Sequence, residues 1–317
     1  MQRNRIKQSV ISVATVLIST TLSSAALAGG ATGYQMVLPS PGFKEKNLSV
    51  SQTQQNVRQE RKAAIRRFAK ALKVSEQQAE AIFSQIKVEK KEPLAASPST
   101  SLGAPSGYAA GWGTAFVGVG GLTRAPVSDK VAGSSLIGIG FGDAAKWLSL
   151  EVDTAITSVN VADGGFGKDG NISLKVSHIF KNNMGVAIGS NNVTGWGNTK
   201  TQSTSSYLAA TKSFALKPQA SHAWPLTISA GVGNGTYSGR TGDPENKYGI
   251  FAAAALVVTP QMSVIVDATG KVLTLGGSLV PFKQLPLVLT AGWYDVTKHL
   301  DTKAPSFMAS AAVVFSF

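Results

Sequence analysis

The sequence predicts an all-β transmembrane antiparallel barrel of about twelve strands, preceded by a short α-helical segment. Over residues 107–317, apolar side chains alternate with small or polar ones in a period of two, which is typical of strands with two unlike faces. The connections between these runs alternate between long and short, as in barrels that cross a membrane. Only 15% of the 317 residues are charged and cysteine is absent, which excludes a disulfide scaffold, a thiolate metal site and a cysteine nucleophile.

Residues 1–28 have the three regions of a secretory signal peptide. A basic start is followed by an apolar stretch over 10–22, and Ala26 and Ala28 supply the small side chains of a cleavage site. The apolar stretch is too short, and too often interrupted by Ser and Thr, to span a membrane as a helix. We therefore expect cleavage after Ala28 and export of the chain; a cytosolic N-terminal helix is the alternative.

Three segments follow the leader. Residues 29–50 carry Gly, Pro and Ser and are expected to be irregular. Residues 51–91 are rich in helix formers and in Lys and Arg, and predict a basic helical hairpin whose second helix is capped by Ser75 on the amide of Gln78. Residues 92–106 predict a Pro/Ser/Ala linker. The hairpin is either a solvated element or one that binds anionic lipid headgroups or a periplasmic anionic polymer; behind a secretory leader, nucleic acid is not an expected partner.

Twelve alternating runs make up the expected barrel, an even number as the class requires. In the run 147–157, Leu148, Leu150 and Val152 share one face, while Ser149, Glu151 and Asp153 share the other. The runs are 108–119, 134–142, 147–157, 171–180, 184–192, 205–214, 225–235, 247–258, 261–268, 271–280, 286–294 and 305–317. The short connection at Thr269-Gly270 and the longer one at 215–224 depart from the alternation.

The alternative to a barrel is a soluble β-sandwich, which would bury the apolar face and expose charges on the other. Here the second face is mostly Gly, Ser, Thr and Ala, which suits a narrow lumen better than a wetted surface. Charges at membrane depth are costly unless they face inward, where they are paired or hydrated. The expected lumen-facing charges are Glu151, Asp153, Lys175 and Asp267. They line a pore or pair with one another, and Lys175 is expected to face Glu151 across neighbouring strands.

The end of the sequence, FMASAAVVFSF, places Phe315 two residues before the terminal Phe317. It resembles the C-terminal signal by which Gram-negative bacterial outer-membrane β-barrels are recognised by their assembly machinery. Together with the leader and the strand spacing, the resemblance is to that class and not to one subfamily. It implies an outer-membrane location, with outer-membrane lipid and the barrel-assembly machinery as partners.

Little in the barrel sequence points to catalysis. Among the histidines, His178 is expected near a membrane interface and His222 in an exposed turn, while His299 lies in an expected outer loop with Asp295, Asp301 and Ser306 nearby. No nucleophile motif, metal-ligand spacing or cofactor motif accompanies it. We therefore predict a non-enzymatic narrow channel or structural surface protein of the outer membrane. The alternatives are a hydrolase or acyltransferase that uses the His299 loop, and an autotransporter-like secretor of the helical segment.

Overall fold

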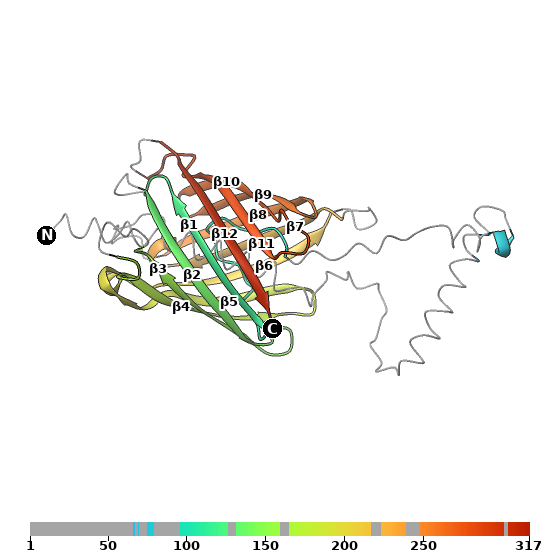
Figure 1. Cartoon of the computed structure of the whole chain (residues 1–317), viewed down its shortest axis with the longest axis horizontal. Helices are drawn as coiled ribbons and strands as arrows, with labels where there is room; N and C mark the ends of the chain where they lie inside the picture. Colours follow the sequence, from blue (N-terminus) through green and yellow to red (C-terminus); the bar gives the residue numbers. More distant parts are fainter. Residues whose placement is uncertain are drawn as a thin grey trace. The chain divides into compact units, whose positions relative to one another are not determined.

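The chain folds into a closed antiparallel β-barrel, as a computed structural model shows (Figure 1). The structure describes Arg66, Ala69 and residues 75–78, 96–125, 131–158, 165–216, 223–238, 248–300 and 304–317. Within these residues, no helix has the length and apolar character that crossing a membrane requires.

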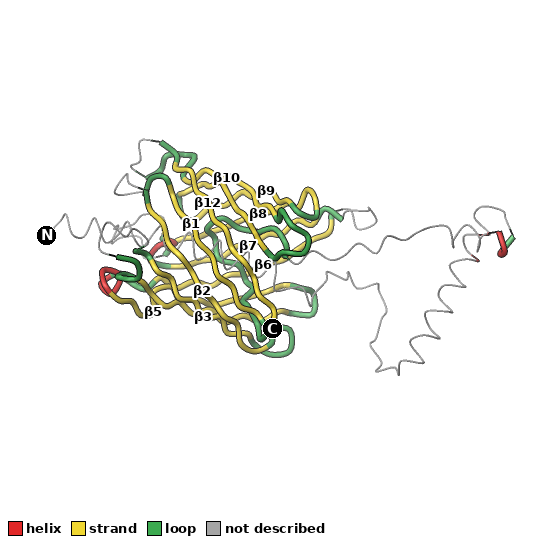
Figure 2. The backbone as a smooth tube through the Cα atoms, viewed as in Figure 1, coloured by secondary structure: helices red, strands yellow, loops and turns green. Residues whose placement is uncertain are grey.

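Twelve strands form the ring, as the sequence predicted. They are β1 (Thr114–Leu122), β2 (Ala132–Gly142), β3 (Ser149–Ile156), β4 (Gly170–Ile179), β5 (Met184–Trp196), β6 (Ser205–Ala215), β7 (Pro225–Gly233), β8 (Gly249–Thr259), β9 (Met262–Thr269), β10 (Val272–Leu279), β11 (Leu287–Tyr294) and β12 (Ser306–Ser316). Each strand pairs with its neighbours in sequence, and β12 pairs with β1, where Ser316 lies opposite Thr114. The strands run at a slant across the barrel wall (Figure 2), and the described ring has no free edge, which a lipid environment demands.

The two ends of the barrel differ in their connections. One end, here named the turn end, holds both ends of the barrel sequence and the connections 143–148, 180–183, 216–224, 260–261 and 280–286. The opposite end, named the loop end, holds 123–131, 157–169, 197–204, 234–248, 270–271 and 295–305. The alternation of long and short connections read from the sequence is confirmed, including its exceptions at 216–224 and 270–271.

The first strand begins later than expected. The alternating run predicts a strand over 108–119, whereas β1 begins at Thr114. Gly113 has a φ of +83°, a conformation that glycine adopts without strain and that turns the chain just before β1. Residues 108–111 lie before this turn, inside the barrel.

Side chains alternate along the strands between a buried inner face and an exposed outer face. On β9, Ser263, Ile265 and Asp267 are buried, and Val264 and Val266 between them are exposed. Most inner positions are Gly, Ala, Ser or Thr, so the wall is rich in hydroxyl groups and its small side chains leave space within the barrel. The inward and outward parity therefore follows the period of two seen in the sequence.

Of the expected helical hairpin 51–91, the structure describes Arg66, Ala69 and residues 75–78. The Gln78 amide donates to Ser75 Oγ at 3.2 Å, and the Ser75 amide donates to Gln78 Oε1 at 3.1 Å. This reciprocal pair is the capping box expected at the start of the second helix.

Candidate functional site

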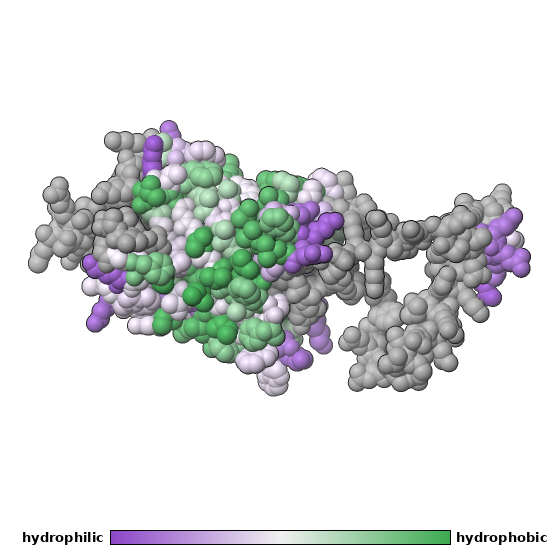
Figure 3. All heavy atoms as spheres, in the orientation of Figure 1, coloured by the Kyte–Doolittle hydropathy of each residue, from purple (hydrophilic) through white to green (hydrophobic). Residues whose placement is uncertain are grey.

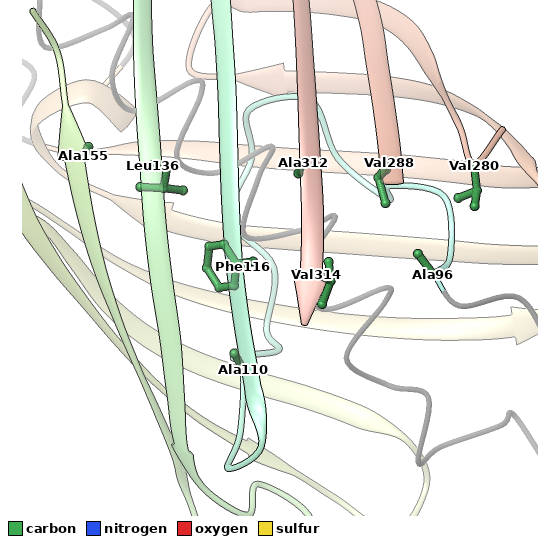
Figure 4. Close-up of a cluster of buried hydrophobic side chains, with 9 residues drawn as sticks. All are labelled: Ala96, Ala110, Phe116, Leu136, Ala155, Val280, Val288, Ala312 and Val314. Atoms are coloured by element: carbon green, nitrogen blue, oxygen red, sulfur yellow. The ribbon is translucent and has the colours of Figure 1, made fainter. Parts of the chain in front are cut away.

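A segment of the chain before β1 lies inside the barrel. Residues 96–111, here named the strap, form a loop that rises from the turn end and descends to it again (Figure 4). The sequence predicted a linker over 92–106, whereas most side chains of residues 96–106 are buried within the lumen. The strap carries no charged side chain. Its backbone makes most of the polar contacts with the wall, while the larger side chains of Leu102 and Tyr108 pack against wall residues.

The rising limb of the strap follows β9 and β10. Ala96 packs at the turn end with Val280, Val288 and Val314 (Figure 4). The strap backbone then forms hydrogen bonds to the side chains of two paired wall residues. The Ser99 amide donates to Ser278 Oγ at 2.9 Å, and Ser263 Oγ donates to the Ser99 carbonyl at 2.7 Å.

The tip of the strap is held by one carboxylate. Asp267 Oδ2 accepts hydrogen bonds from the Ser101 hydroxyl at 2.9 Å and from the amides of Leu102, Gly103 and Ala104 at 3.0, 2.9 and 2.8 Å. Three successive amides aimed at one anion form a backbone nest. Hydrogen bonds to an ionised group are about twice as strong as those between neutral groups. Asp267 is therefore the main polar anchor of the tip.

The descending limb crosses to the other side of the lumen. The Gly107 amide donates to Thr211 Oγ1 on β6 at 2.7 Å, and the Ala109 amide donates to Ser177 Oγ on β4 at 3.0 Å. The Ala110 amide donates to Glu151 Oε2 on β3 at 2.6 Å. Since β3 and β9 lie six strands apart in a ring of twelve, the two carboxylates hold the strap from opposite walls.

The four charges predicted for the lumen, Glu151, Asp153, Lys175 and Asp267, are all buried on the inner face. Glu151 and Lys175 are directly opposed in the β3–β4 register, and Lys175 Nζ lies 3.8 Å from Glu151 Oε1. Asp153 follows two residues further along β3, opposite Ser173. Three carboxylates and one ammonium give this set an excess of negative charge, which the strap amides on Glu151 and Asp267 offset in part.

A loop closes over the strap at the loop end. Tyr237, in the short 3-10 helix η4 (Gly235–Tyr237), is fully buried, with its ring 5.3 Å from that of Tyr207 and 5.3 Å from that of Phe251. Its hydroxyl accepts a hydrogen bond from Asn191 Nδ2 at 2.6 Å, and burial raises its pKa well above the usual value. Ala104 of the strap tip belongs to the same cluster, so the tip and this loop pack together.

The histidines are placed as follows. His178 Nδ1 is hydrogen-bonded to the Trp147 carbonyl near the turn end, and His222 lies outside the described residues. His299 is exposed, and Asp295 accepts the amides of His299 and Leu300 at 2.8 and 2.9 Å. Ser306 Oγ is buried and accepts the Arg124 amide at 2.9 Å, whereas Asp301 lies outside the described residues. These hydrogen bonds order the loop backbone.

The remaining predicted residues lie at the ends of the chain. Phe315 and Phe317 are exposed on the outer face at the turn end, where the Phe317 ring lies 6.2 Å from that of Trp112. The cleavage residues Ala26 and Ala28 lie outside the described residues. Within the described residues, no three His, Cys, Asp or Glu side chains gather in a way that could hold a metal ion.

Two wall glycines leave room for the strap. A Cβ at Gly140 would overlap the backbone of Ala110 and Gly111, and one at Gly185 would overlap the ring of Tyr108. We therefore expect Gly140→Val to displace the descending limb. Overpacking costs about 1–3 kcal/mol, so a cysteine introduced at Ser106 should react with a polar maleimide about tenfold faster. In the control, Ala210→Val adds volume on the outer face and should leave the labelling rate unchanged; equal rates in the two variants would contradict the prediction.

The outer surface of the barrel carries an apolar belt (Figure 3). Its exposed side chains include Val119, Ile137, Ile188, Val264 and Leu275. Large exposed aromatic residues stand at both ends: Trp112 and Trp147 at the turn end, and Tyr248 and Trp293 at the loop end. A closed barrel with an apolar band between exposed aromatic residues at both ends is the architecture of a transmembrane β-barrel of the outer-membrane type.

Comparisons with known proteins return structures of this class. The barrel is similar to an outer membrane channel from Pseudomonas putida F1, with 11% identity, a TM-score of 0.38 and coverage of 65% of this chain and 96% of that one. It is also similar to a dimer of the outer membrane phospholipase of Salmonella typhi with bound calcium (12% identity, TM-score 0.37, 65% and 91% covered) and to outer membrane phospholipase A of Escherichia coli (10%, 0.34, 64% and 92%). No family model and no curated protein matches the sequence.

The strap is the part of the site that sequence reasoning missed. Its Pro, Ser, Gly and Ala content is that of a linker, and period-two analysis gives no signal for an irregular segment. One feature could have revealed it: residues 93–123 contain no charged side chain, although exposed linkers are usually polar. An uncharged stretch of small residues directly before a barrel is suited to lie inside it.

Proposed function

We propose that the protein is a narrow, gated channel of the outer membrane that its own strap closes at rest. The observation that carries the proposal is the path of the strap, which enters and leaves the lumen at the turn end. A segment with this path can be withdrawn from the lumen without being threaded through it. A barrel of twelve strands is also narrower than porins of 16–18 strands, so a single loop of chain is enough to block it.

The inner wall is suited to water once the strap has left. The strap contacts the hydroxyl groups of Ser177, Thr211, Ser263 and Ser278 and the carboxylates of Glu151 and Asp267. Each of these groups can form hydrogen bonds to water instead, so opening leaves a polar lumen and not an apolar cavity. This chemistry supports a channel over a barrel that is only a structural anchor.

The path of the strap also indicates from which side of the membrane the strap enters the lumen. In this class the short turns face the periplasm and the longer loops face outward. We therefore propose that the turn end, where Ala96 lies, faces the periplasm, and that a periplasmic anionic polymer is a partner of the basic segment 51–91. An autotransporter-like secretor would instead lead its passenger out at the loop end.

A disulfide between the strap and the wall tests the gate in this cysteine-free chain. Ser99→Cys and Ser278→Cys are introduced together with Asp267→Asn, which weakens the tip. In planar bilayers the oxidised protein should stay closed, because the strap is tethered, and a reductant should produce current. Currents that are equal before and after reduction would overturn the proposal.

The hydrolase alternative depends on His299. The Asp295 carboxylate orders the backbone of its loop, and the Ser306 hydroxyl is engaged with the Arg124 amide. We expect the wild-type protein and His299→Ala to hydrolyse phospholipid at the same background rate in detergent micelles. Activity in the wild type that is lost in His299→Ala would favour the enzyme.

A further inference from the structure

The lumen holds the strap mainly by its backbone. Amides of residues 99, 102–104, 107, 109 and 110 donate to wall side chains. Two carbonyls accept in turn: that of Ser99 from Ser263 Oγ, and that of Ala109 from Ser149 Oγ at 3.2 Å. Two strap side chains add to these backbone contacts: the Ser101 hydroxyl donates to Asp267, and the Tyr108 hydroxyl donates to the Asn183 carbonyl at 2.8 Å. Because every peptide presents such amides and carbonyls, the wall has the hydrogen-bonding groups that bind the backbone of an extended or turning peptide.

The space available in the lumen and the charge of its wall determine which peptides it can bind. The strap backbone lies against Gly140, and the Tyr108 ring and the Gly107 carbonyl lie against Gly185, so neither wall position can gain a side chain. Reciprocally, a Cβ on Gly107 of the strap would overlap the Gly185 carbonyl. The carboxylates Glu151, Asp153 and Asp267 face the occupant with Lys175 as their buried counter-charge, so an acidic peptide is disfavoured.

We propose that the lumen is a binding site for uncharged peptides rich in Gly, Ala, Ser and Pro, and that the strap is its tethered occupant. This inference rests on the proposed channel function and adds how the channel is regulated. A separate peptide with the strap sequence should enter from the turn end whenever the tethered strap is weakened. Asp267 then determines the specificity for the peptide, because its carboxylate accepts hydrogen bonds from three consecutive amides and one hydroxyl at the tip.

The test uses the full-length protein with a weakened strap. Gly103→Pro and Ala104→Pro remove two amide donors to Asp267 and add no charge. Heat-modifiable gel migration checks that this variant is folded. The probe is a fluorescent synthetic peptide of residues 96–111, and the matched control peptide is N-methylated at Gly103 and Ala104, so that its side chains are unchanged. Binding is measured by anisotropy in detergent, and block of current is measured in planar bilayers with peptide added to each side.

We expect the unmodified peptide to bind the variant and the methylated peptide to bind about a hundredfold more weakly, since it lacks two charge-assisted hydrogen bonds and each is worth about 1.4 kcal/mol, a factor of ten in affinity. Block should occur from the turn end only. Adding Asp267→Asn to the variant should weaken the binding of the unmodified peptide, so that the two peptides then bind with equal affinity.

The outcomes separate the two proposals. Equal binding of both peptides, or no binding of either to the folded variant, overturns the peptide site even if the variant conducts. Selective binding to a variant that carries no current supports the peptide site and overturns the channel.

Discussion

Replacing Asp267 with asparagine is expected to open the barrel. The carboxylate accepts the Ser101 hydroxyl and three amides of the strap tip, and the neutral amide loses the charge that strengthens these bonds. A loss of about 3 kcal/mol would raise the ratio of open to closed states roughly a hundredfold. Single-channel recording in planar bilayers measures the open probability directly.

Asp143→Asn is the matched control for this prediction. It removes the same charge from a turn outside the lumen, where Asp143 pairs with Lys146 at 3.1 Å and where that hydrogen bond lowers the pKa of Asp143. We expect its open probability to equal that of the wild type. If Asp267→Asn also remains closed, the tip is not held by this carboxylate.

Replacing Lys175 with methionine is expected to lower the free energy of unfolding by about 3 kcal/mol. The ammonium is buried and faces Glu151 across the β3–β4 pair, so its removal leaves a buried carboxylate with no adjacent cation on that pair. Urea titration in lipid vesicles, followed by heat-modifiable migration, measures the loss. The double variant Glu151→Gln with Lys175→Met should regain part of it, because no unpaired charge then remains at this pair.

Lys146→Met provides the comparison at an exposed ion pair. Lys146 and Asp143 lie 3.1 Å apart with both side chains largely in solvent, and such pairs contribute about 0–1 kcal/mol. Its unfolding midpoint should stay close to that of the wild type. A loss as large as that of Lys175→Met would show that burial does not govern the effect.

The strands were predictable because the barrel imposes a strict pattern on each of them. Lipid outside and a narrow interior require opposite chemistry on alternate residues. Val264, Ile265 and Val266 are three consecutive apolar residues, so their faces could be assigned only from the alternation of the longer run around them. The facing of Lys175 and Glu151 followed from strand adjacency alone. Connection lengths then indicated which strand ends share a side of the membrane.

The strap and the Tyr237 loop could not be predicted in the same way. An irregular segment has no period, and its partners are distant in sequence: the Leu102 and Gly103 amides meet Asp267, more than 160 positions further on. Tyr237 lies in a connection that sequence reasoning assigned only to an outer loop. Such contacts depend on the closed shape of the ring, which local sequence does not specify.

The seam between β1 and β12 has a consequence for how the molecule is assembled. These two strands stand at opposite ends of the barrel sequence, so bringing them together carries the largest loop-closure entropy in the sheet. The strap precedes β1 directly and is bonded to both β3 and β9. It therefore links the first and last thirds of the sheet. Because of this link, less conformational entropy remains to be lost when β1 and β12 pair.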